Sequence, residues 1–127
     1  MEKKATMGTD EWIKHLVQSI DNRDADSFVS FLTDDVMFRF GNAEPVNGKE
    51  NVGNAVGGFF ESIKALEHDV FEIVEQRDTV ICHGVVTYTR HDSSTLRVPF
   101  ANMFKIRENL IKEYLIFIDV SELYNPA

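Results

Sequence analysis

Two polar side chains, Asn102 and Tyr114, interrupt apolar strand patterns near the end of the chain. Asn102 shares its face of the predicted strand with four apolar residues (Val98, Phe100, Phe104 and Ile106). A buried amide without a partner costs about 1–3 kcal/mol, so Asn102 needs a hydrogen-bond partner. With a three-residue turn at 107–109, Asn102 faces Tyr114 across a hairpin. We therefore expect an Asn–Tyr pair on an apolar surface, able to bind a ligand oxygen.

Three residues are candidates for a general base. Asp119 follows the last strand pattern and could act if apolar surroundings raised its pKa, although capping a short helical turn is the competing role. Strict alternation also places Asp119 on the face opposite Tyr114. His68, which begins a strand, could line the mouth of a pocket, and His15, one turn from Trp12, could point inward.

The chain lacks the patterns of metal, phosphate and disulfide sites. The four histidines (His15, His68, His83 and His91) form neither an HxH nor an HExxH motif. The glycine-containing stretch 53–60 lacks the Lys-Ser/Thr of a phosphate-binding loop. The single cysteine, Cys82, excludes an internal disulfide and suits a reducing cytoplasm. We expect no metal and no cofactor.

Length and charge restrict the class of protein. The 127 residues fit one domain, which we place at 9–127 after a flexible tail at 1–8. The formal net charge of −8 argues against nucleic acid and anionic membranes as partners. No apolar run approaches the length of a transmembrane helix, and the first residues lack the apolar core of a secretory signal.

Three helices are predicted in the first half of the chain, over about 10–22, 25–32 and 48–65. Thr9 or Asp10 is the expected N-cap of the first helix, and Asp24 that of the second. Asn47 and Glu50 resemble a capping box for the third helix.

Strands are predicted at 36–40 and, in the second half, at 68–76, 79–90, 97–106 and 110–119. The order αα-β-α-ββββ indicates an α+β domain with a mostly antiparallel sheet. Strand 79–90 carries Cys82 and Tyr88 on one face and His83 on the other, which we assign to the exterior. Because both faces are partly apolar, the outer face is predicted to form an interface, most simply in a homodimer.

Three segments resemble the SnoaL-like, ketosteroid-isomerase-related branch of the nuclear transport factor 2-like superfamily: DNRDADSFVSFLTDDVMFRFGN at 21–42, VNGKENV at 46–52, and VPFANMFKIRENLIKEYLIFIDVSELY at 98–124. The resemblance implies a curved sheet wrapped as a cone around helices, with a pocket inside and dimerisation through the outer face. Members of the superfamily include isomerases, polyketide cyclases, epoxide hydrolases, dehydratases and proteins without catalytic activity.

The resemblance transfers few catalytic residues. The aspartate base of the steroid isomerases corresponds to Phe40, their tyrosine donor to Leu16, and their protonated acid to Asn102. An epoxide-hydrolase aspartate falls near Ile116, whereas the acid/base aspartate of the SnoaL-like cyclases falls near Asp119. Of the isomerase set, only Asn102 could still donate a hydrogen bond to a carbonyl.

These observations predict catalytic roles for Asn102, Tyr114 and Asp119 in a pocket that takes a small, flat, hydrophobic molecule. The predicted pocket residues are Trp12, His15, Leu16, Phe38, Phe40, Phe59, His68, Phe100, Phe104 and Ile116. The first hypothesis is an isomerase, cyclase or lyase acting on a hydrophobic carbonyl compound. The alternatives are a non-catalytic ligand-binding domain and a dimeric scaffold whose interior is filled.

Overall fold

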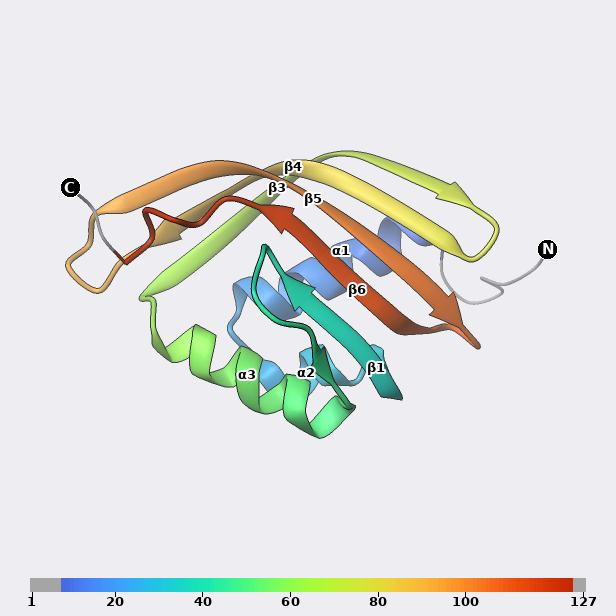
Figure 1. The fold of residues 1–127 in the computed structure, drawn as a ribbon. Coiled ribbons are helices and arrows are strands. Elements are labelled where there is room, and N and C mark those ends of the chain that lie inside the picture. Colours follow the sequence, from blue (N-terminus) through green and yellow to red (C-terminus); the bar gives the residue numbers. More distant parts are fainter. Residues whose placement is uncertain (1–7, 125–127) are drawn as a thin grey trace.

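The computed structural model describes residues 8–124, which form three helices and one six-stranded sheet (Figure 1). The elements are α1 (Thr9–Asp21), α2 (Ala25–Val29), β1 (Leu32–Phe40), β2 (Val46–Asn47), α3 (Lys49–Glu61), β3 (Ala65–Gln76), β4 (Thr79–Thr89), β5 (Thr95–Arg107) and β6 (Leu110–Ile118). This order confirms the predicted α+β class and adds the short strand β2. Most of the predicted tail lies outside the described residues, while Gly8 is the N-cap of α1. Within 8–124, no helix is long and apolar enough to cross a membrane.

The sheet has the strand order β2-β1-β6-β5-β4-β3. All neighbouring strands are antiparallel except β1 and β6, which are parallel. The long strands β3 to β6 arch over the helices, so that the sheet has a concave inner face and a convex outer face (Figure 1). Helix α1 contacts β3, and α3 contacts β1 and α2. The space between the concave face and the helices is therefore where the core and any internal site must lie.

The helix starts correct two of the predicted caps. Helix α1 is preceded by Gly8 without a side-chain cap, so neither Thr9 nor Asp10 has that role. Helix α3 begins after Gly48, which has φ +95°, and the predicted Asn47 capping box is absent because Asn47 belongs to β2, opposite Met37. The prediction for α2 is confirmed: the side chain of Asp24 accepts a hydrogen bond from the Ser27 N–H at 3.1 Å.

The hairpin β5–β6 has a different register from the one predicted. Its turn contains two residues, Glu108 and Asn109, both with positive φ (53° and 70°), as in the turns that suit the twist of a hairpin. A register shift follows close to the turn, between Lys105 and Ile106. As a result Asn102 lies opposite Ile116 on β6, and the predicted pairing of Asn102 with Tyr114 is wrong.

A bulge in β3 brings its backbone close to β4. The register shifts between Val70 and Glu72, which leaves Phe71 as the additional residue. A Cβ atom at Gly84 of β4 would lie 1.9 Å from the carbonyl oxygen of Asp69. Glycine is therefore required at this position by the close approach of the two strands.

Candidate functional site

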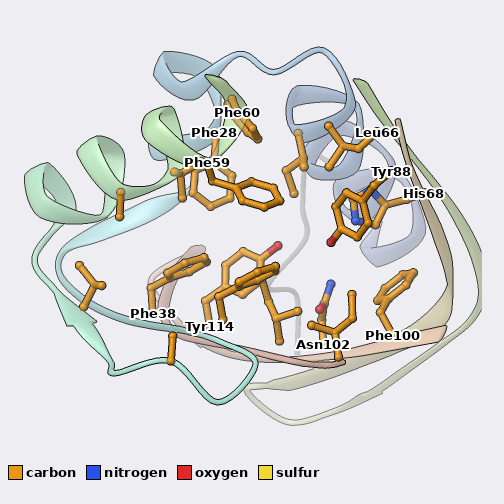
Figure 2. A pocket seen from close by; sticks show the side chains of 18 of the residues that line it. Phe28, Phe38, Phe59, Phe60, Leu66, His68, Tyr88, Phe100, Asn102 and Tyr114 are labelled. Atoms are coloured by element: carbon orange, nitrogen blue, oxygen red, sulfur yellow. The ribbon is translucent and has the colours of Figure 1, made fainter. Parts of the chain in front are cut away.

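A cavity of about 210 Å³ lies between the concave face of the sheet and the helices (Figure 2), and the exposed residues Ala43 and Glu44 form part of its rim. Eight aromatic side chains line it: Phe28, Phe38, Phe40, Phe59, Phe60, Tyr88, Phe100 and Tyr114. They come from α2, α3 and four strands, β1, β4, β5 and β6. Phe28, Phe60 and Tyr88 are not among the predicted site residues. Because Phe40 and Phe59 border a hollow space, the interior is not filled as the scaffold hypothesis requires.

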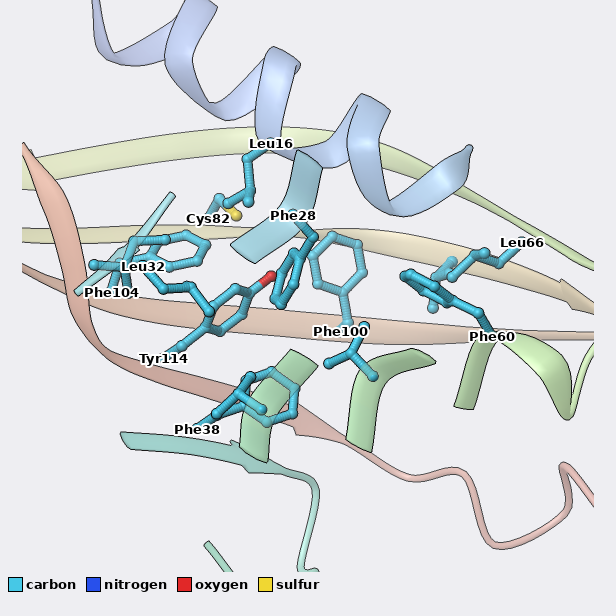
Figure 3. Close-up of a cluster of buried hydrophobic side chains, with 14 of the residues drawn as sticks. Leu16, Phe28, Leu32, Phe38, Phe60, Leu66, Cys82, Phe100, Phe104 and Tyr114 are labelled. Carbon is cyan, nitrogen blue, oxygen red and sulfur yellow. The ribbon is translucent and has the colours of Figure 1, made fainter. Parts of the chain in front are cut away.

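The cavity wall contains eight of the predicted site residues: Phe38, Phe40, Phe59, His68, Phe100, Asn102, Tyr114 and Ile116. The predicted residues outside the wall lie mainly in the solid part of the core, part of which is shown in Figure 3. Trp12 packs edge-on against Phe104, with ring centroids 5.5 Å apart, and Leu16 and Phe104 are both fully buried. His15 is half-buried on α1 and does not line the cavity. Helix α1 thus fills the space over Phe104, and the cavity lies beside Phe100 on the same strand.

Asn102 is buried in the cavity wall, with 4% of its surface exposed. Its Nδ2 lies 3.9 Å from Sγ of Cys82, its partner on β4. Its Oδ1 has no hydrogen-bond partner among the described residues. Burial raises the pKa of the Cys82 thiol to about 11, so this thiol is neutral near pH 7. Asn102 is therefore held by a weak contact, and its amide is available to a ligand.

Two tyrosine hydroxyls, those of Tyr88 and Tyr114, point into the cavity from opposite walls (Figure 2). Neither hydroxyl has a hydrogen-bond partner within the part of the chain that the structure describes. Burial holds the pKa of both phenols well above the usual range, so both remain protonated donors. Tyr88 could have been found from the alternation of strand 79–90, which places it on the same face as Cys82.

His68 is paired with Asp21, the last residue of α1. Its Nδ1 lies 2.6 Å from Oδ1 of Asp21, and its backbone N–H donates to Oδ2 at 3.0 Å. The two side chains are 11% and 22% exposed, and the imidazole packs edge-on against Phe100. Since an ionised carboxylate only accepts hydrogen bonds, neutral His68 carries its proton on Nδ1 and keeps Nε2 as an acceptor. This pairing fixes the tautomer of an imidazole at the cavity wall.

Asp21 was not predicted as a site residue, although the sequence contains a signal for it. An acidic side chain in the last turn opposes the helix dipole, and the last turn of α1 holds no basic residue. Such a placement suggests a specific partner elsewhere in the fold. The partner, His68, is 47 residues away in the sequence.

Asp119 is exposed and lies outside the cavity wall. It accepts a hydrogen bond from the Ser121 N–H at 3.0 Å, and this bond lowers the pKa of the carboxyl group. A role as a base would require a raised pKa, whereas the pKa of Asp119 is lowered. The carboxylate instead fixes the turn that leads to Leu123, whose N–H donates to the Val120 carbonyl.

The other histidines lie elsewhere. His83 is on the outer face of the sheet, as predicted, with Nε2 3.0 Å from Glu72, and His91 is exposed beside the Glu61 carbonyl. Across residues 8–124, no three His, Cys, Asp or Glu side chains are grouped so that they could hold a metal ion. In the described part of the chain, the titratable side chains that line the cavity are therefore His68, Tyr88, Tyr114 and Glu44, and Asp21 contacts the cavity only through His68.

Comparison with known proteins places this geometry in a recognised fold. Residues 13–114 match the SnoaL-like domain. None of the curated proteins matches the chain. A solved protein with a ketosteroid isomerase-like fold from Catenulispora acidiphila DSM 44928, in complex with trimethylamine, superposes with a TM-score of 0.82 at 13% identity and covers 90% of this chain and 89% of its own.

Two further solved structures carry the names of enzyme classes. A protein described as a SnoaL-like polyketide cyclase from Jannaschia sp. CCS1 has a TM-score of 0.77 and 18% identity, covering 90% of this chain and 87% of its own. A LEH-like epoxide hydrolase from M. tuberculosis has a TM-score of 0.76 and 12% identity, covering 90% and 84%. At these identities the likeness concerns the fold.

Proposed function

Because the chain belongs to the SnoaL-like domain family, we propose that its cavity binds a small hydrophobic carbonyl compound and that His68 removes a proton next to the carbonyl. The observation that carries this proposal is the 2.6 Å contact between Nδ1 of His68 and Asp21 at the wall of an apolar cavity. The proposed reaction class is an isomerisation, cyclisation or elimination that needs no cofactor.

The cavity residues supply the groups that such a reaction requires. The carbonyl oxygen accepts hydrogen bonds from Tyr88, Tyr114 or the Asn102 amide, and these donors stabilise the negative charge that develops on it. Nε2 of His68 takes the proton, and the carboxylate of Asp21 stabilises the imidazolium that forms. Return of the proton to another carbon completes an isomerisation, whereas loss of a leaving group completes an elimination.

The same pair provides a connection to solvent. His68 and Asp21 also border a surface groove between α1 and β3. Solvent in this groove reaches the Asp21 carboxylate, which is 22% exposed and balances the charge of a protonated His68.

The test is a proton abstraction that does not require knowledge of the natural substrate. A base removes the ring C–H proton of benzisoxazole, the N–O bond breaks, and cyanophenolate forms, which is followed by absorbance. We expect the protein to accelerate this reaction and His68→Gln to lower the rate by about 10²–10⁴-fold, the usual contribution of a positioned base. His91→Gln, which changes an exposed histidine, is the matched control. Equal rates for the wild type and His68→Gln would show that His68 is not the base.

We also propose that the convex face of the sheet forms a homodimer. Large apolar side chains are exposed on it, including Val74 at 51%, Ile81 at 41% and Phe117 at 57%. Ile81 lies between Val74 on β3 and Met103 on β5, so the apolar surface is continuous across strands. Surfaces of this kind commonly mark association sites.

Sedimentation analysis tests the dimer. We expect Phe117→Asp to convert a dimer to a monomer, because burying an unpaired charge is costly. Tyr124→Asp, which changes an aromatic side chain of similar exposure (58%) outside the sheet, should leave the dimer intact. A wild-type protein that sediments as a monomer at micromolar concentration would contradict this proposal.

A further inference from the structure

We infer that the cavity selects uncharged compounds of a single ring with a short oxygen-bearing substituent, and that it rejects the matching carboxylates and fused polycyclic compounds. This inference rests on the proposed function, since it names the class of carbonyl compound that the same cavity accepts. It follows from the volume of the cavity and from the charges around it.

The volume limits the ligand to about one ring. An engineered apolar cavity of about 150 Å³ binds benzene, whereas pockets for drug-sized ligands span about 300–1,000 Å³. At about 210 Å³ the present cavity is larger than the benzene-binding cavity and smaller than a pocket for a drug-sized ligand. The difference leaves room for a short substituent on one ring. Flat aromatic walls, including Phe38, Phe59 and Phe100, suit a flat ring at this size.

The charges around the cavity disfavour an anion. No Lys or Arg is among the described residues that line it, and the one carboxylate in the lining, Glu44, stands in the exposed loop after β1. Burial is the main cause of the raised pKa of Tyr88 and of Tyr114, and the negative charge of Asp21 raises both pKa values further. A protonated His68 would be balanced by the same carboxylate of Asp21.

A carboxylate that enters this cavity loses its hydration and finds no unpaired cation, which makes its transfer costly. A ketone of the same shape avoids this cost and still accepts hydrogen bonds from Tyr88, Tyr114 or Asn102. The preference for the ketone over the carboxylate thus arises because the cavity lacks a cation, while its hydrogen-bond donors bind the neutral carbonyl oxygen.

Acetophenone and benzoate form a matched pair of probes, because a methyl group in one replaces a charged oxygen in the other. Binding is measured by calorimetry and by chemical shifts of the Asn102 side-chain amide in labelled protein. We expect acetophenone to bind at least ten-fold more tightly than benzoate, acetonaphthone to bind more weakly, and androstenedione not to bind inside the cavity. Benzoate binding as tightly as acetophenone, or androstenedione shifting the Asn102 amide, would overturn the inference, as would the absence of acetophenone binding.

Two variants identify the origin of the selectivity. Asp21→Asn removes the negative charge behind His68 and is expected to reduce the preference for acetophenone over benzoate several-fold; an unchanged preference would refute the electrostatic argument. His68→Gln is expected to retain acetophenone binding while losing proton abstraction. Selective binding without proton abstraction in the wild type would therefore refute the proposed reaction and leave the ligand class standing, whereas abstraction without selectivity would do the reverse.

Discussion

Replacing Asp21 with Asn tests the arrangement of the base without removing the base itself. In the wild type, one carboxylate oxygen contacts Nδ1 of His68 at 2.6 Å and the other accepts the His68 backbone N–H at 3.0 Å. The amide of Asn has the same shape, and its oxygen can still accept the backbone N–H. Its nitrogen then faces Nδ1 and donates to it, so the ring proton moves to Nε2. His68 would present a donor to the cavity in place of an acceptor.

The expected effect on activity is much larger than the effect on stability. A base with its proton on the wrong nitrogen loses about the full contribution of a positioned base, about 10²–10⁴-fold in rate. The stability loss is that of exchanging a charged for a neutral hydrogen bond at a site where Asp21 is 22% exposed, which amounts to about 1 kcal/mol. A fall in rate without unfolding is the expected outcome.

The assay combines benzisoxazole turnover with the nitrogen chemical shifts of the His68 ring. These shifts distinguish the Nδ1–H form of the ring from the Nε2–H form. If the role of Asp21 were purely structural, Asp21→Asn would leave the tautomer of His68 unchanged. Asp10→Asn, at an exposed carboxylate in the first turn of the same helix, is the control. A full rate in Asp21→Asn, with the proton still on Nδ1, would refute the assignment of His68 as an oriented base.

Two further predictions concern stability. Gly84→Ala is expected to lower the free energy of unfolding by about 3 kcal/mol or more, because the new Cβ would lie 1.9 Å from the Asp69 oxygen. Gly57→Ala, in an open helical position, should raise the free energy of unfolding by about 1 kcal/mol. Equal urea midpoints for the two variants would contradict this reasoning. Burial raises the pKa of Cys82 from 9.0 to about 11, so folding favours the neutral thiol. This contribution to the free energy of unfolding, about 3 kcal/mol, is complete below pH 9.0 and is lost as the pH rises through about 11. Urea unfolding between pH 8 and pH 11 should show this decline, and Cys82→Ala should reduce it; a decline of the same size in the variant would count against the thiol.

Much of the fold and part of the site could be predicted from local pattern. The alternation in strand 79–90 correctly places Cys82 inside and His83 outside, because successive side chains of a strand point to opposite faces. The alternation in strand 97–106 likewise places Asn102 on the buried face. The cap at Asp24 could also be predicted, since it depends on residues only three positions apart.

The pairing of strands could not be predicted in the same way. The predicted and observed registers of β5 and β6 differ by two residues, so Asn102 lies opposite Ile116 in place of Tyr114. A shift of two residues keeps every side chain on the same face, and alternation is therefore equally consistent with both registers. The positive φ angles of the two turn residues and the shift beside Lys105 decide between them.

The amino-acid sequence by itself determined which side chains are apolar, which of them share a face, and that Asn102, Tyr114 and His68 are polar groups near apolar ones, because these properties depend on neighbours in the chain. The tertiary structure decided which apolar residues leave a cavity and which base has a partner. Phe104 is covered by Trp12 of α1, whereas Phe40 borders open volume. Both outcomes depend on how distant helices and strands fill a shared space, which no local periodicity records.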